Sequence, residues 1–378
     1  MQTLLNGFFF GDKVPKFDYS AIRPEGALIR GFGGTSSGHG PLKELHENLT
    51  ELYSKKVGEP ISSVDIVDTE NLIGRCVVAG NVRRSAALAM GRHDDSHYLE
   101  MKNDSEKLRH HRWGSNNSFN ALVGMDYTWH AEQSQKNGEP GYIWLNNART
   151  RGRFKDGERL DDINVAGFNP CVEQQLEDAE LCCLVETFPA KHDDMEDYLR
   201  TLKIAYLYGK TITLSNTHWP ETNRVMLRNR RIGCSVSGVA QFVTNRGLDE
   251  FKEWLNDGYD VIQQWDKQYS DWMAVPRSIK TTSVKPSGTV SLLAGATPGL
   301  HYPESRFYII AGSFGNRVNA EKLMLQLKAK GFDSSVLEMK NSNSYRVAFA
   351  GYANMNAANQ QLAVLRKNEN SSAWILPN

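Results

Sequence analysis

The residues best suited to chemistry in this 378-residue chain are an amide, a thiol and a carboxylate at Asn169, Cys171 and Glu173. In extended backbone, alternate side chains point to the same face, so these groups would meet on one side of the chain. A thiol beside a hydrogen-bonding amide and a potential base predicts a reaction centre. The alternative is a buried cysteine in a turn opened by Asn169 and Pro170, because free cysteine often packs as a small hydrophobe.

The other cysteines favour chemistry over a disulfide framework. Cys182 follows Cys171 by eleven residues, and three more cysteines are scattered at Cys76, Cys183 and Cys234. An odd number of widely spaced cysteines favours a catalytic or redox role for some of them. The chain has no Cys-x-x-Cys pair, so we predict no metal site.

Composition argues against several classes of function. The chain has 44 basic and 44 acidic residues, and 40% of its residues are hydrophobic. Zero net charge gives no bulk attraction to nucleic acid or to an anionic membrane, so we expect neither as a direct partner. No apolar run approaches membrane-spanning length and no signal peptide is recognisable, which predicts a soluble, cytoplasmic protein.

A candidate phosphate site follows a predicted strand at residues 279–284. Pro286, Ser287, Gly288 and Thr289 lead there into an apolar helix start. Backbone N–H groups and hydroxyls at a helix entrance suit an anion, although the spacing is not that of a P-loop.

Two further segments have alternative interpretations. The glycine-rich loop at residues 31–38 suits a loop wrapped around a ligand or one packed against the core. An arginine cluster at residues 223–231 indicates either anion binding or an exposed helix face.

The elements that must position these groups alternate between strand and helix, which predicts an α/β fold. Helices are expected at 41–55, at 195–208, at 248–273 and after Ser63 as N-cap, and a β-branched run occupies residues 210–214. The tail is expected to form strand, helix, strand and strand at 306–310, 319–330, 336–339 and 345–350.

Seven motifs, taken together and in order, resemble ribonucleotide reductase, most closely the adenosylcobalamin-dependent class II enzymes of the short, monomeric type. They are Ile22-Arg23-Pro24 with its glycine loop, Gly80-Asn81-Val82-Arg83-Arg84-Ser85-Ala86, Asn116-Asn117-Ser118, Gly138-Glu139-Pro140-Gly141, Asn169-Pro170-Cys171-Val172-Glu173, Arg230-Arg231-Ile232-Gly233, and Lys285-Pro286-Ser287-Gly288-Thr289 through His301-Tyr302-Pro303.

The resemblance implies a ten-stranded α/β barrel, incomplete at its N-terminus, with Cys171 on a finger loop inserted through its middle. The site should be shielded there, because a thiyl radical is quenched in water. The implied division is a catalytic barrel over residues 1–304 and a small C-terminal α/β subdomain over residues 305–378.

The implied activity is reduction of ribonucleotides to 2′-deoxyribonucleotides, which supplies DNA precursors, with adenosylcobalamin as cofactor. A thiyl radical on Cys171 would abstract the ribose 3′ hydrogen, Glu173 would be the general base, and Asn169 would orient the ribose hydroxyls. Cys182 would deliver reducing equivalents. Substrate binding is implied for Ser287, Gly288, Thr289 and Pro286 at the phosphates, and for Asn117 and Ser118 in the pocket.

Two features of the family have no match in this sequence. Its other reducing cysteine lies in a segment before the Ile-Arg-Pro loop, and a cysteine pair follows near its C-terminus. We therefore expect a C-terminal portion or one part of a split enzyme. Its expected partners are an N-terminal complementing polypeptide and a thioredoxin-like or dithiol reductant, and cobalamin is expected to dock on the tail from Arg306 onward.

Three alternatives stay open at this point. The chain could be a non-catalytic nucleotide-binding subunit that acts only with its complement. A class I reductase would need a tyrosine pair near the C-terminus, and no Tyr-Tyr occurs. A glycyl-radical type would need a C-terminal glycine loop, which residues 346–352 resemble only superficially.

Overall fold

The computed structural model of the chain describes every residue except 32, 302–306, 339–343, 353–354 and 378. It forms two compact units, which are described separately. The first unit comprises Met1–Thr187, Leu199–Ser235 and Asn256–Lys285, and the second comprises Phe188–Tyr198, Val236–Leu255 and Pro286–Asn378.

The first unit begins with three helices, α1 (Gln2–Phe9), α2 (Gly40–Ser54) and α3 (Ser63–Val78). Their apolar faces bury a shared cluster of Leu4, Leu45, Leu49, Tyr53 and Leu72. The N-cap of α3 is Ser62, one residue before the predicted cap, and it forms a capping box with Asp65.

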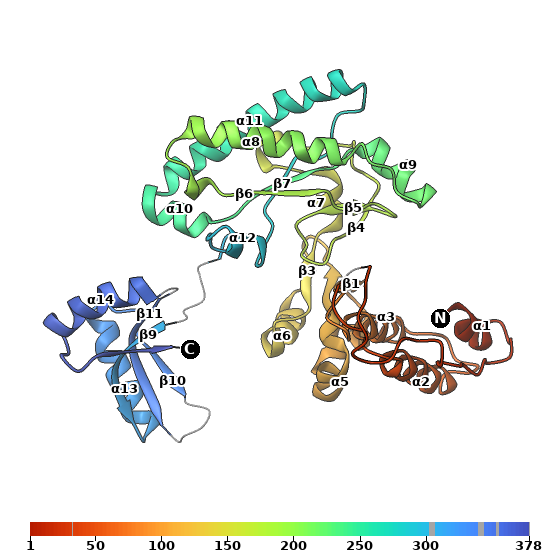
Figure 1. Cartoon of the computed structure of the whole chain (residues 1–378), viewed down its shortest axis with the longest axis horizontal. Helices are drawn as coiled ribbons and strands as arrows, with labels where there is room; N and C mark the ends of the chain where they lie inside the picture. Colours follow the sequence, from red (N-terminus) through yellow and green to blue (C-terminus); the bar gives the residue numbers. More distant parts are fainter. Residues whose placement is uncertain (32, 302–306, 339–343, 353–354, 378) are drawn as a thin grey trace. The chain divides into compact units, whose positions relative to one another are not determined.

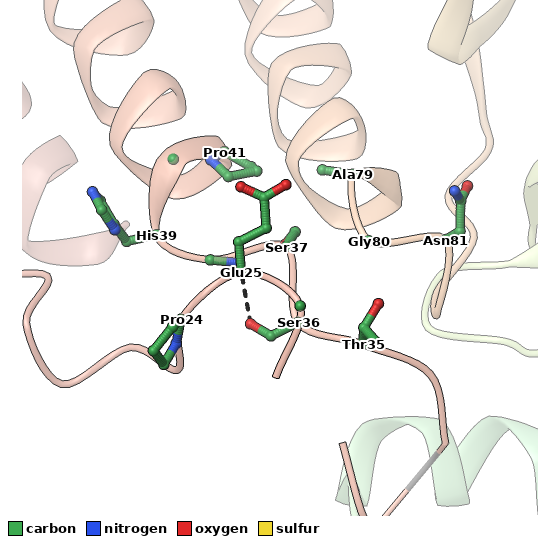
Figure 2. Close-up of a pocket in the computed structure, with 13 residues that line it drawn as sticks. Pro24, Glu25, Thr35, Ser36, Ser37, His39, Pro41, Ala79, Gly80 and Asn81 are labelled. Carbon is green, nitrogen blue, oxygen red and sulfur yellow. Dashed lines mark hydrogen bonds between the residues drawn. The ribbon is translucent and has the colours of Figure 1, made fainter. Parts of the chain in front are cut away.

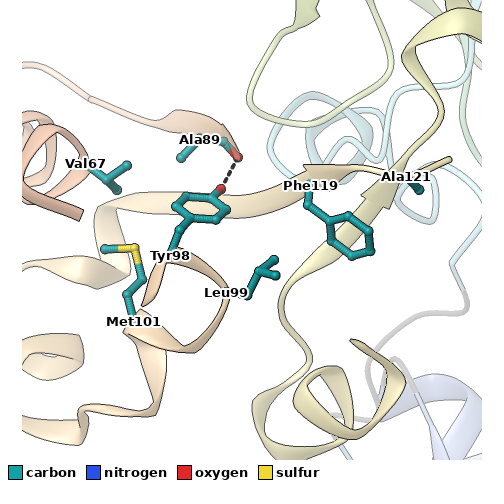
Figure 3. Packing of buried hydrophobic residues seen from close by; sticks show 7 residues of the cluster. All are labelled: Val67, Ala89, Tyr98, Leu99, Met101, Phe119 and Ala121. Carbon is teal, nitrogen blue, oxygen red and sulfur yellow. Dashed lines mark hydrogen bonds between the residues drawn. The ribbon is translucent and has the colours of Figure 1, made fainter. Parts of the chain in front are cut away.

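A parallel sheet follows, in the order β1 (Ala87–Arg92), β2 (Ser115–Asn120) and β3 (Gly141–Ile143). Its core contains Tyr98, whose hydroxyl donates to the carbonyls of Ala89 at 2.7 Å and Ser118 at 2.8 Å (Figure 3). Gly91 is required beside this ring, because a Cβ there would overlap the Tyr98 side chain. The buried tyrosine therefore links β1 to β2, the strand that carries Asn117 and Ser118.

Two further sheets complete the strands of this unit. An antiparallel pair joins β4 (Val165–Phe168) and β5 (Gln175–Glu177), and a three-stranded sheet has the order β6 (Leu184–Thr187), β7 (Gly233–Val236), β8 (Thr282–Ser283). The shorter helices are α4 (Ser96–Glu100), α5 (Ser105–His110), α6 (Thr128–Asn137), α7 (Leu145–Thr150) and α9 (Pro220–Asn229). Two long helices, α8 (Met195–Ile212) and α11 (Leu248–Met273), contribute residues to both units.

The second unit contains α10 (Val239–Arg246), the four-residue α12 (Val290–Leu293) and a C-terminal α/β segment. In that segment the chain runs through β9 (Phe307–Phe314), α13 (Arg317–Ala329), β10 (Ser335–Glu338), β11 (Tyr345–Tyr352), α14 (Met355–Asn368) and β12 (Trp374–Pro377). The strands form an antiparallel sheet in the order β10-β11-β9-β12, and both helices pack on it (Figure 1). This is the β-α-β-β-α-β arrangement of ferredoxin-like folds.

The predicted mixed α/β class is confirmed. Within the described ranges the strands form separate sheets of three, four, two and three strands, and a closed ten-stranded barrel is not among them. None of the helices in the described part of the chain has the length and apolar character that crossing a bilayer requires.

Several local predictions differ from the structure in informative ways. The predicted strand at 279–284 is reduced to the two residues of β8, and the β-branched run at 210–214 continues α8 as far as Ile212. The four predicted tail elements are present, and α14 and β12 follow them. Phe32, Tyr302, Pro303, Arg306 and the proposed 304/305 boundary lie outside the described residues, and the domain division stays a prediction.

Candidate functional site

Residues 169–174, which we call the finger loop, connect β4 to β5. The loop is closed at its base, because Asn169 N–H donates to the Gln174 carbonyl at 3.1 Å and Gln174 N–H donates to Asn169 Oδ1 at 3.0 Å. Val172 has φ of 66°, so the backbone turns here rather than extending as the spacing predicted. Asn169 is buried, and its side-chain oxygen serves the loop itself.

Glu173 is the most enclosed ionisable group of the loop, with a side chain only 1% exposed. Its Oε1 accepts a hydrogen bond from Lys285 Nζ at 2.7 Å. Its Oε2 is buried and has no hydrogen-bond partner among the described residues. The carboxylate therefore has one oxygen held and the other unpaired.

The two thiols lie within electrostatic reach of the same ion pair. Lys285 Nζ is 4.0 Å from Cys171 Sγ. Burial acts to lower the pKa of Lys285, but the hydrogen bond and charge of Glu173, helped by Cys171 and Cys182, raise it overall. Burial raises the pKa of Cys182, and Glu173 raises it further, while Lys285 acts in the opposite direction. The structure thus brings Cys171 and Glu173 together at Lys285, with Cys182 within electrostatic range of them.

The arm that carries Lys285 is attached to the finger loop and to the sheet behind it. Ser283 Oγ donates to the Glu173 carbonyl at 2.8 Å, and Lys285 N–H donates to Ser235 Oγ at 2.8 Å. Sequence analysis assigned no role to Lys285. The signal that could have found it is its place immediately before the Pro-Ser-Gly-Thr segment, but its contact with Glu173 spans more than a hundred residues of sequence.

The base of the finger loop is held by Arg231, which is completely buried. Its guanidinium donates to both oxygens of Asp162, at 2.6 and 2.9 Å, and its Nε lies 3.0 Å from Glu180. Asp162 precedes β4 and Glu180 follows β5, so one side chain joins the two ends of the hairpin. Arg231 belongs to the predicted arginine cluster at residues 223–231, and its partners are protein carboxylates rather than an external anion.

Gly233 lies close beside this clamp, at the start of β7. A Cβ at this position would overlap the side chains of Gln174 and Leu184. The glycine therefore leaves room for Gln174, the last residue of the finger loop, which is itself 2% exposed.

Asn117 and Ser118, predicted to line the substrate pocket, are buried in β2. Asn117 Oδ1 accepts from Ser115 Oγ at 2.9 Å, while its Nδ2 is buried without a partner in the described part of the chain. The neighbouring Asn116 donates from its side chain to the Pro170 carbonyl at 2.7 Å. The strand is therefore in direct contact with the finger loop.

The predicted phosphate loop belongs to the second unit. Ser287 has φ of 57°, and its Oγ accepts from Ser291 N–H at 3.4 Å. Pro286, Gly288 and Thr289 complete a turn that enters the short helix α12, in which Thr289 is the N-cap residue. The predicted order of loop and helix start is present, and phosphate binding stays a prediction.

A separate pocket of about 710 Å³ lies in the first unit, where the glycine-rich loop meets the start of α2 and the end of α3 (Figure 2). Its lining residues lie between 24 and 41 and between 79 and 81, and include none of the predicted site residues. Ser36 Oγ accepts from Gly38 N–H at 3.1 Å, which shapes the loop at the pocket wall.

The described residues do not enclose the sulfur of Cys171. Cys171 and Cys182 are both exposed, whereas the resemblance implied a shielded sulfur. The physical reason lies in the sheets, because strands arranged in small open sheets do not surround a loop as a closed barrel would.

Comparison with known proteins places this geometry in a family. An adenosylcobalamin-dependent ribonucleoside-triphosphate reductase from Euglena gracilis is 53% identical over 312 residues, and a probable one from Dictyostelium discoideum is 52% identical over 313 residues. Each alignment covers 82% of this chain but only 42% and 41% of the respective relative.

A crystal structure of a B12-dependent class II ribonucleotide reductase superposes with a TM-score of 0.70 and 33% identity. The superposition covers 93% of this chain and 50% of that chain. At this identity and coverage, the fold is that of a ribonucleotide reductase. Within that class, the chain belongs to the adenosylcobalamin-dependent family, and it spans about half the length or less of the relatives that it matches.

The C-terminal segment matches a protein-family model. A model described as SPOR domain covers residues 303–377. The part of the chain outside the superposition with the class II structure is shorter than this segment. The span of the superposition therefore extends into the C-terminal α/β segment.

Proposed function

We propose that this chain forms part of a catalytic unit that reduces ribonucleoside triphosphates to 2′-deoxyribonucleoside triphosphates. The observation that carries the proposal is the contact of one ammonium group, that of Lys285, with both Cys171 and Glu173, with Cys182 within electrostatic range. The triphosphate is chosen because the relatives are named ribonucleoside-triphosphate reductases.

The chemistry assigns one task to each group. The thiyl radical of Cys171 takes the 3′ hydrogen atom, and Glu173 accepts the proton of the 3′-hydroxyl. The 2′-hydroxyl leaves as water after gaining a proton. Two thiols, of which Cys182 is one, supply two electrons and two protons and become a disulfide, and Cys171 returns its hydrogen atom to C3′. We propose that Asn169 orients the ribose hydroxyls through its amide nitrogen.

The remaining substrate contacts are proposed from the resemblance. Pro286, Ser287, Gly288 and Thr289 would hold the phosphates, supported by the turn and helix start found there. Asn117 and Ser118 would line the pocket, supported by the unpaired Asn117 amide and by the contact between β2 and the finger loop.

Adenosylcobalamin, when bound, would supply the one-electron oxidation that turns the Cys171 thiol into a thiyl radical. The exposed sulfur fits an oxidant that approaches from outside the loop. The tail from residue 306 onward remains our proposed docking segment, and Arg306 itself lies outside the described residues.

We further propose that the sheets of this chain are parts of a ten-stranded barrel that a further polypeptide completes. Superposition on half of a class II reductase supports this. Such a polypeptide would also enclose Cys171 and bring the second reducing thiol. The exposure of Cys171 favours a second candidate as well, in which the chain binds nucleotide but performs no chemistry without its complement.

The test is the Cys171→Ser variant, assayed with a ribonucleoside triphosphate, adenosylcobalamin, a dithiol and a complementing N-terminal polypeptide. We expect deoxyribonucleotide formation and the thiyl-coupled paramagnetic signal to disappear, because a hydroxyl does not form the corresponding radical. Cys76→Ser, which changes a half-buried cysteine of α3, is the control and should retain activity. An active Cys171→Ser enzyme would refute the proposal.

A further inference from the structure

Lys285 occupies the centre of the candidate site, yet no step of the reaction described above uses it. Its ammonium contacts Glu173 Oε1 at 2.7 Å and lies 4.0 Å from the sulfur of Cys171. Its side chain is 29% exposed, whereas that of its carboxylate partner is 1% exposed. The lysine is therefore the solvent-side member of a pair whose acid is buried.

The position of this lysine is built into the fold. Its backbone N–H is tied to Ser235, a completely buried residue of β7, and Ser283 of the same arm binds the Glu173 carbonyl. One hydrogen bond to the finger loop and one to β7 therefore hold the arm in place independently of the ion pair. A chance surface ion pair has no such support.

The charge of Lys285 matters because Glu173 has little contact with water. A carboxylate that is removed from water stays ionised only when an opposite charge or several hydrogen bonds compensate it. The two groups that share the electrostatic environment of this pair, Cys171 and Cys182, are thiols and bring no positive charge. A general base must be ionised before the proton transfer, so the lysine meets a requirement of the proposed chemistry.

The geometry also distinguishes the two carboxylate oxygens. Oε1 is taken by the ammonium, and Oε2 is buried without a partner in the described part of the chain. An unpaired buried acceptor is unfavourable, and a hydroxyl group that reaches it would satisfy it. The arrangement therefore leaves one defined atom to accept a proton.

We propose that Lys285 is a positioning residue that keeps Glu173 ionised and holds its Oε1, so that Oε2 accepts the 3′-hydroxyl proton. This inference rests on the proposed role of Glu173 as the base. A merely structural ion pair would affect folding stability, but it would not change the pH dependence of turnover.

The first experiment measures the protonation of Glu173 without any turnover. Infrared difference spectra of the full chain are recorded for wild type, Lys285→Met and Lys285→Arg. The carboxyl band of Glu173 is assigned by its absence when the same spectra are recorded with Glu173→Gln. We expect a protonated carboxyl band at neutral pH in Lys285→Met only. Lys56→Met is the matched control, because Lys56 is 34% exposed and pairs at 3.0 Å with Asp65, which is 7% exposed.

The second experiment measures turnover of the complemented enzyme against pH. In Lys285→Met we expect kcat at neutral pH to fall about 100-fold, the lower end of what a general base contributes, and to recover partly as pH rises. In Lys285→Arg the pH profile should match wild type but with a lower kcat, because a guanidinium fork can occupy both carboxylate oxygens. KM should change little in either variant.

The outcomes separate this inference from the proposed function. If Glu173 stays ionised in Lys285→Met, or the pH profile of that variant equals wild type, the role of Lys285 is wrong although the enzyme is active. If Lys285→Arg turns over as fast as wild type, the assignment of the two oxygens is wrong. If wild type forms no deoxyribonucleotide, the proposed function fails, and the infrared spectra still decide whether Lys285 keeps Glu173 ionised.

Discussion

Among single residues, Val172, which follows Cys171, adopts a strained backbone conformation. Its φ of 66° lies in the left-handed region, where a β-branched side chain is rarely found. Strained backbone conformations of this kind cluster at functional sites, where the surrounding structure holds them in place. Here it lets the chain turn between Cys171 and Glu173, so that the thiol and the carboxylate both face Lys285.

A Val172→Asn substitution tests this strain, because asparagine tolerates the left-handed conformation. We expect the free energy of unfolding to rise by about 1 kcal/mol, measured by urea denaturation. Val57→Asn is the control, since Val57 is an exposed valine without a positive φ. An equal change in both variants would show that Val172 is not strained.

Between elements, the finger hairpin depends on a balanced group of buried charges. Arg231 and Lys280 face Asp162 and Glu180, and Lys280 lies 3.7 Å from Asp162. The clamp joins the start and the end of the hairpin to the segment before β7. It therefore sets the position of the finger loop without touching the reactive groups.

Removing the central cation should be costly, because it leaves two buried carboxylates short of a partner. For Arg231→Met we expect a loss of about 3–5 kcal/mol in the free energy of unfolding. Arg228→Met removes a neighbouring arginine that is 49% exposed and pairs with Glu177, and it should cost less than about 1 kcal/mol. Similar losses in chemical denaturation of the two variants would contradict the clamp.

At the scale of the whole molecule, the features that the sequence predicted are those that depend on local sequence pattern. Periodicity gave α2 and α11 to within a residue, and the motif of Asn169, Cys171 and Glu173 marked the loop on which Cys171 and Glu173 meet Lys285, whose role as a reaction centre stays a prediction. It could not show that Asn169 closes the loop with its own side chain, or that Lys285 pairs with Glu173, because both contacts require the folded chain. The expected extended backbone was wrong for the same reason, since the turn at Val172 is set by the hairpin.

Complementation is the prediction that belongs to the whole molecule. In the proposed reaction, reduction of one ribonucleotide consumes two thiols besides the radical thiol, and among the predicted site residues only Cys182 offers a further thiol. The cysteines Cys183 and Cys234 are buried, and burial raises the pKa of Cys183 to about 11 and that of Cys234 to about 12, so neither is a ready thiolate.

With adenosylcobalamin and dithiol we therefore expect no sustained deoxyribonucleotide synthesis until an N-terminal polypeptide carrying a cysteine is added. The measurement is product formed per chain over time, with a Cys→Ser form of that polypeptide as control. Repeated turnover by the chain alone would instead show that Cys182 and the external dithiol suffice for the reduction.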